Sequence, residues 1–198
     1  MRSLRLAALA VCTLSLVGVA CGSDDPEALT GPTSGRTSGR TSGPGSTTAP
    51  PWGLEDVPMP NDEDAVEAVF AAFPQELGGL ERSDAPPMQV AYGNGATFVR
   101  AIDLAQVEDE GFPGTAPAYL ELLAGSGEVD VETQVTDAAF VYLVSTNSVQ
   151  DAPDAEARTT YDAAWGDADG GWLFVSSATS PEDREALASA FASTAGSV

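Results

Sequence analysis

The chain has 198 residues, and its 30 Asp and Glu against 8 basic residues give a formal net charge of -22 at pH 7. Every basic residue is Arg, and the sequence has two Cys and neither His nor Lys. The acidic balance excludes the basic surface that nucleic-acid binding requires. The missing residue types exclude Ser-His-Asp and Cys-His catalysis, imidazole-ligated zinc and Schiff-base chemistry on a lysine.

The N-terminus has the pattern of an export signal. Arg2 and Arg5 precede an apolar stretch within residues 1–20. This stretch has the length of a signal peptide and is too short to span a bilayer comfortably. Cys12 lies inside it and would be removed with it, so Cys21 would be the thiol of the mature chain.

The segment Gly18-Val19-Ala20-Cys21 resembles the lipobox of bacterial lipoprotein signals, in particular those of high-GC Gram-positive (actinobacterial) proteins. The resemblance implies a diacylglyceryl group on the Cys21 thiol and cleavage before it by signal peptidase II, with Gly18, Val19 and Ala20 as the recognised residues. The family usually has Leu where this chain has Gly18. Small residues at Gly18 and Ala20 also suit ordinary signal peptidase, so secretion without a lipid is the alternative.

The composition changes after Cys21. A Thr-Ser-Gly-Arg repeat within residues 33–44 has no apolar side chain to bury, and such sequence cannot recover the entropy of ordering. We therefore predict a lipidated N-terminus and flexible linker over residues 21–60, with a reach on the order of 35 Å. Residues 61–198 have the apolar periodicity and the size of one globular domain.

The first part of this domain is predicted to be a helix followed by a hairpin. Apolar residues at helical spacing indicate a helix that Asn61 caps and that ends near Pro74: Val66, Val69, Phe70, Phe73 and Leu77. Residues 88–92 and 96–103 flank Gly93-Asn94-Gly95, and its Asn-Gly pair is typical of a tight hairpin turn with positive φ angles.

A short helix and a strand come next. Thr115 and Pro117 open the helix, and Gly125 is expected to end it in a left-handed conformation. Residues 129–135 alternate between apolar and polar, which predicts a strand with one face in the core and one in water. The wet face would carry three carboxylates, those of Glu128, Asp130 and Glu132.

The last part is predicted to contain three strands and a helix. Residues 140–145 are apolar enough for a central strand, and residues 159–165 and 172–177 flank a polar loop as a second hairpin. Ser180-Pro181-Glu182-Asp183 is the start of a final helix. The order α-β-β-α-β-β-β-β-α indicates an α+β fold, with helices packed on a largely antiparallel sheet of about five to six strands. This arrangement is loosely similar to the PsbP-like α/β/α sandwich of other exported lipoproteins.

Two constellations are candidate ligand sites. Trp165 and Trp172 flank the second hairpin loop and would form a sugar- or peptide-binding patch if both were exposed, although aromatics placed so usually pack across the strands. Asp167 and Asp169 copy the start of a calcium loop, but Ala178 stands where that loop needs its last Glu. A polar hairpin turn is therefore the favoured explanation of the two Asp residues, and we expect no metal or other cofactor.

The sequence therefore predicts a lipoprotein held at the outer face of the cytoplasmic membrane by its N-terminal lipid, with a non-catalytic binding or interaction role in the cell envelope. Its partner would be an envelope protein or a small ligand, and not a nucleic acid. The alternatives are a cell-wall hydrolase that uses a pair of carboxylates and a secreted module stabilised by calcium.

Overall fold

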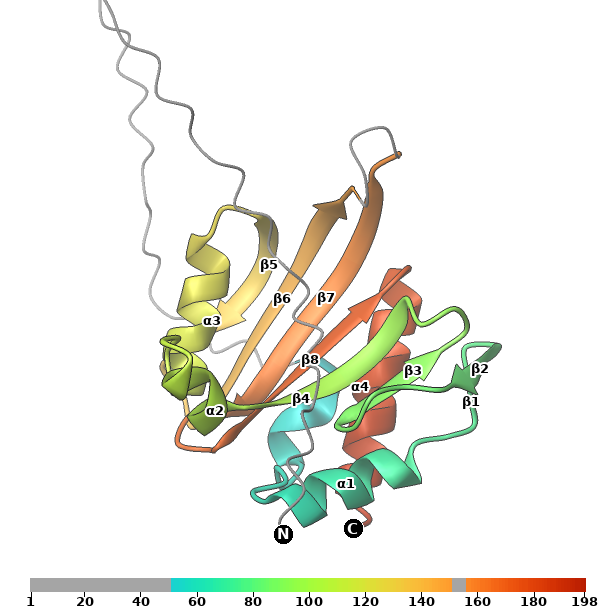
Figure 1. The fold of residues 1–198 in the computed structure, drawn as a ribbon, viewed down its shortest axis with the longest axis horizontal. Coiled ribbons are helices and arrows are strands. Elements are labelled where there is room, and N and C mark those ends of the chain that lie inside the picture. The colour runs from blue at the N-terminus through green and yellow to red at the C-terminus, as the bar shows by residue number, and fades with distance from the viewer. Residues whose placement is uncertain (1–50, 151–155) are drawn as a thin grey trace, which may run out of the picture. The chain divides into compact units, whose positions relative to one another are not determined.

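The computed structural model describes residues 51–150 and 156–198 (Figure 1). Within these ranges, eight strands form one sheet in the order β1-β2-β3-β4-β8-β7-β6-β5, and every neighbouring pair is antiparallel. This confirms the predicted α+β class, although five to six strands was an undercount. The predicted signal peptide, Cys21 and most of the predicted linker lie outside the described residues.

The sheet consists of two meanders that meet where β4 pairs with β8. The first meander contains β1 (Glu76–Leu77), β2 (Leu80–Ser83), β3 (Gln89–Tyr92) and β4 (Thr97–Asp103). The second contains β5 (Val129–Val135), β6 (Phe140–Val149), β7 (Arg158–Asp167) and β8 (Trp172–Ala178). The helical elements are the 3-10 segment η1 (Pro51–Asp56), α1 (Glu63–Ala72), α2 (Leu104–Asp109), α3 (Ala116–Gly125) and α4 (Pro181–Ala195).

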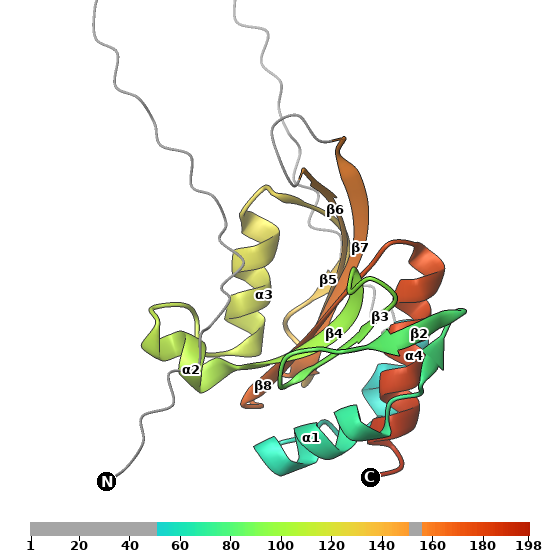
Figure 2. The ribbon, with the colours of Figure 1, turned by 45° about the vertical axis from the view of Figure 1, so that its right-hand side comes forward.

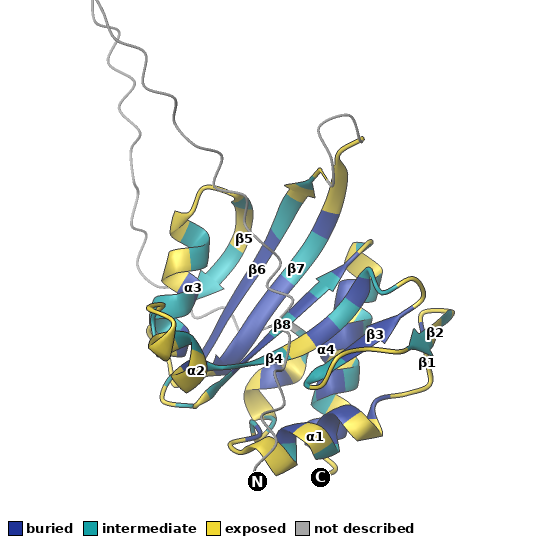
Figure 3. Ribbon diagram, viewed as in Figure 1, coloured by how far each residue is buried: buried dark blue, intermediate teal, exposed yellow. Residues whose placement is uncertain are grey.

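The helices cover both faces of the sheet (Figures 1 and 2). On one face, η1, α1 and α4 enclose a core rich in aromatic rings, where the centroids of Phe174 and Phe191 lie 4.6 Å apart. On the other face, α2 and α3 bury Leu104 and Leu120 against Leu143 and neighbouring side chains. Figure 3 shows the buried residues concentrated in the strands between these layers.

The α1 helix ends near Pro74 as predicted, but its N-cap and the place of Leu77 differ from the prediction. Asp62, and not Asn61, is the N-cap, because its Oδ1 accepts a hydrogen bond of 2.8 Å from the backbone of Ala65. The helix stops before Pro74, whose ring disfavours a helical conformation in the preceding residue. Leu77 therefore lies in β1, which turns back into β2 through Gly78 and Gly79, both with positive φ.

Two turns differ from the prediction in one left-handed residue each. In the β3–β4 hairpin, Gly93 (φ 61) and Gly95 (φ 84) adopt the left-handed conformation, while the Oδ1 of Asn94 accepts a hydrogen bond from the backbone of Ala96. After α3, the left-handed residue is Gly127 (φ 73) and not Gly125. The hairpin, the helix and the positive φ of Gly95 were thus predicted, but the left-handed conformations of Gly93 and Gly127 were not.

The alternation predicted for β5 is interrupted by a β-bulge. Val131 pairs with Ser145 and Thr133 pairs with Val144, so Glu132 is an extra residue between the two pairs. A bulge of this kind exchanges the faces of the residues that follow it. Val131 is 38% exposed, whereas Val135 packs against the core on the η1 and α4 side. The predicted single apolar face is therefore wrong.

The α4 helix begins as predicted. Ser180 is its N-cap, and the Ser180 Oγ accepts a hydrogen bond of 3.1 Å from the backbone of Asp183. Leu187 and Phe191 are fully buried. Among residues 51–150 and 156–198, no helix combines the length and apolar character needed to cross a membrane.

Candidate functional site

The two tryptophans of the second hairpin do not form an exposed patch. Trp165 is fully buried, with its ring centroid 5.3 Å from that of Phe191 and 6.5 Å from that of Phe174. Trp172 is partly buried and packs against the same core. Packing across the strands accounts for both side chains.

Asp167 and Asp169 lie at a hairpin turn. The carbonyl of Asp167 accepts a hydrogen bond of 3.1 Å from the backbone of Gly170, and partial burial raises the pKa of the Asp167 carboxyl. Across the described ranges, no three His, Cys, Asp or Glu side chains are grouped so that they could hold a metal ion. The lipidation site Cys21 and the recognition residues Gly18, Val19 and Ala20 lie outside the described residues.

A polar groove with a volume of about 380 Å³ lies where β5 begins, beside the end of β6 and the start of β7. We call it the polar groove; its lining residues are Gly127, Glu128, Val129, Asp130, Thr146, Asn147, Ser148 and Thr159. Strand pairing brings Asp130 beside Thr146, and Ser148 beside Thr159. Its lining therefore combines two carboxylates with hydroxyl and amide groups, which can bind a cationic or hydroxyl-rich ligand.

An arginine of α4 is buried against the sheet. Arg184 of α4 donates from Nη1 and Nη2 to the two carboxylate oxygens of Glu132, both at 3.1 Å. Its Nη1 also donates to the carbonyl of Ser145 at 3.2 Å, opposite the bulge. The guanidinium lies 5.7 Å from the ring centroid of Trp52 and 5.9 Å from that of Tyr161. We call these side chains, Arg184, Glu132, Trp52 and Tyr161, the Arg184 clamp.

The clamp and the polar groove adjoin through strand pairing. Tyr161 pairs with Thr146, which lines the groove, and Thr146 pairs in turn with Asp130. The clamp thus joins η1, β5, β7 and α4 at one end of the sheet. Charge-assisted, bidentate hydrogen bonds and stacking on aromatic faces are uses for which Arg is suited and Lys is not.

Asp162 of β7 is a partly buried carboxylate in this region. Burial raises its pKa, while hydrogen bonds from Ser177 and Thr160 and the positive charge of Arg184 act in the opposite direction. The Thr160 Oγ1 donates to the Asp162 Oδ2 at 3.0 Å. Ser145, Asp162 and Ser177 stand side by side across β6, β7 and β8, and the buried Ser145 Oγ has no hydrogen-bond partner. This row is a second polar feature of the sheet.

Sequence reasoning missed both the clamp and the Asp162 row. Arg184 was visible as the one basic residue after Arg158, but its partner Glu132 appeared to belong to a wet strand face. The Glu132 side chain is indeed 40% exposed, but the bulge and α4 also bring its carboxylate onto a buried guanidinium. The signal in the sequence that could have indicated this ion pair was Arg184 itself, a single basic residue in the predicted C-terminal helix.

The chain was compared with protein-family models, with curated proteins and with solved structures, and none of them matches it. The functional argument therefore depends on the residues of this chain.

Proposed function

We propose that the chain is a lipid-anchored extracytoplasmic protein whose domain has a non-catalytic binding role in the cell envelope. The observation that carries the proposal is Cys21, which follows Gly18-Val19-Ala20 at the end of a charged and then apolar segment. Acyl chains on an N-terminal Cys attach a protein to a bilayer, and more than one chain makes the attachment durable.

The charge of the domain supports a lipid as the means of attachment. Cleavage before Cys21 would remove Arg2 and Arg5 but no acidic residue, so the mature chain would be more acidic than the whole sequence. Anionic headgroups repel such a surface within the Debye length, about 10 Å at 0.1 M salt. The acyl chains would then supply all of the attraction to the membrane.

The polar groove supports the binding role. Glu128 and Asp130 line it together with four hydroxyl- or amide-bearing side chains. In an acidic domain, such a groove favours a cationic ligand, such as a polyamine or a basic peptide segment, whose approach the overall field accelerates.

Replacing Cys21 with Ser is expected to abolish membrane attachment in the native host. The wild-type protein should fractionate with the membrane, and the mass of its mature N-terminus should show acyl chains on Cys21. Cys12→Ser is the matched control, because that thiol lies inside the predicted signal peptide and should leave both results unchanged. An unacylated Cys21, or cleavage at another position, would contradict the anchor.

Neutralising the polar groove is expected to weaken binding of a polycation. Using spermidine as the probe, we expect the E128Q/D130N variant to bind about tenfold more weakly by calorimetry, which corresponds to about 1.4 kcal/mol. The control E63Q/D64N removes the same charge from the exposed first turn of α1. An equal loss in both variants would show attraction to the overall charge and would contradict a groove-specific site.

A further inference from the structure

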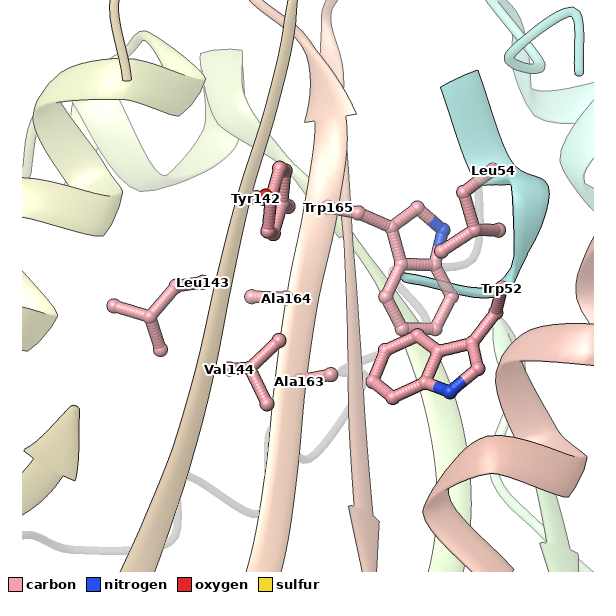
Figure 4. A pocket seen from close by; sticks show the side chains of 8 residues that line it. All are labelled: Trp52, Leu54, Tyr142, Leu143, Val144, Ala163, Ala164 and Trp165. Carbon is pink, nitrogen blue, oxygen red and sulfur yellow. The ribbon is translucent and has the colours of Figure 1, made fainter. Parts of the chain in front are cut away.

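A narrow slot lies between η1 and the sheet (Figure 4). Trp52 and Leu54 of η1 form one wall, and the other is made mainly by Tyr142, Val144, Ala163 and Trp165 of β6 and β7. The space left between these side chains does not admit a water molecule. The slot is therefore filled by the protein's own η1 segment.

Trp165 brings an unused hydrogen-bond donor to this slot. The residue is fully buried, and its Nε1 has no acceptor. Figure 4 shows the nitrogen edge of its ring turned toward η1. Buried donors in folded proteins are nearly always paired with protein or water, so an orphan donor needs an explanation. Water cannot supply the acceptor here, because the slot is too narrow to hold one.

The segment that closes the slot is held in a strained conformation. Trp52 has φ 75 and Gly53 has φ 69, so two consecutive residues are left-handed, and one of them carries a large side chain. Such conformations are unfavourable for residues other than glycine, and they persist only where the surrounding contacts hold them in place. Here those contacts are the buried side chain of Leu54 and the Arg184 guanidinium facing the Trp52 ring.

We propose that the slot is a ligand site that opens when η1 lifts from the sheet, and that it takes a small planar apolar ring carrying a hydrogen-bond acceptor. The ring would replace Trp52 and Leu54 against Val144, Ala163 and Trp165. The acceptor would pair with the Trp165 Nε1, which the closed state leaves unsatisfied. Strain at Trp52 and the orphan donor both disfavour the closed state, so a ligand that relieves them shifts the population toward the open one. This inference concerns the domain alone and is independent of lipidation at Cys21.

The test uses two ring probes that differ at one atom, quinoline with a ring nitrogen acceptor and naphthalene without one. In the full chain, W52A removes the Trp52 side chain that fills part of the slot. This variant is expected to bind quinoline roughly tenfold more tightly than the wild-type protein does, as measured by NMR titration. Adding W165F should abolish the preference for quinoline over naphthalene while naphthalene still binds. W172F is the matched control, because Trp172 does not line the slot, and it should leave both affinities unchanged.

Hydrogen exchange of the wild-type protein tests the opening without any variant that might fail to fold. If η1 lifts, the Trp165 indole proton should exchange at least about tenfold faster than the most protected backbone amides of β7, since these exchange only on global unfolding. Exchange of the indole proton at the same rate as those amides would overturn the proposal. A W52A variant that folds but binds neither probe, or that binds both equally, would also overturn it.

Discussion

Replacing Phe174 with Ala is expected to lower the free energy of unfolding by about 4 kcal/mol, because Phe174 is fully buried and the substitution leaves a cavity at the centre of the aromatic core. Its ring centroid lies 4.6 Å from that of Phe191, 6.3 Å from that of Phe70 and 6.5 Å from that of Trp165. These rings come from α4, α1 and β7. One deletion therefore loosens three elements together, and their rigid packing restricts how far they can collapse into the space.

Urea unfolding of the full chain measures this effect. Phe112→Ala is the matched control, because Phe112 is 50% exposed and its loss should change the stability by no more than about 0.5 kcal/mol. Equal effects of the two substitutions would mean that the aromatic core does not pack as described.

Replacing Arg184 with Met is expected to lower the free energy of unfolding by about 2 to 3 kcal/mol. Removing one partner of a buried ion pair typically costs about 3 to 5 kcal/mol, and the value is smaller here because the Glu132 side chain is 40% exposed. The substitution also leaves the carbonyl of Ser145 without its side-chain donor and removes the cation from the faces of Trp52 and Tyr161. Arg184→Lys should recover only part of the loss, because Lys cannot make the bidentate contact.

A double-mutant cycle with Glu132→Gln separates the ion pair from the packing. We expect a coupling energy of about 1 to 2 kcal/mol between the two positions, as for other residues in direct contact. Additive losses would show that Arg184 stabilises the domain by packing and by its bond to Ser145 alone.

The elements that could be identified from the sequence are those with a clear local pattern, either a regular spacing of apolar residues or a turn motif between two strands. The helix from Ser180 places Leu187 and Phe191 at helical spacing in the core, and the hairpin at Gly93-Asn94-Gly95 combines two strands with a turn motif. The missed elements are short: β1 has two residues, and α2 starts directly at the end of β4, where the Asp103 Oδ1 accepts a capping hydrogen bond of 2.9 Å from the backbone of Ala105. Elements of this length are defined by tertiary contacts and not by a repeating pattern.

The candidate site was less predictable than the fold, because its geometry depends on contacts between distant segments. Glu132 meets Arg184 only because a bulge changes the faces of β5 and α4 packs beneath it. The position of Trp165 and Trp172 beside a hairpin loop favoured packing across the strands, and both side chains do pack in the core. The buried indole nitrogen of Trp165 was visible only in three dimensions.

The strand order has a consequence for how the domain folds. Each meander is assembled from strands that follow one another in sequence, whereas the pairing of β4 with β8 joins residues as distant as Phe98 and Ser177. Closing so long a loop costs more chain entropy than forming any hairpin, and non-local pairing of this kind slows folding. Pairing of β4 with β8 is therefore expected to form late in folding. It would join the two locally formed meanders into one cooperative unit.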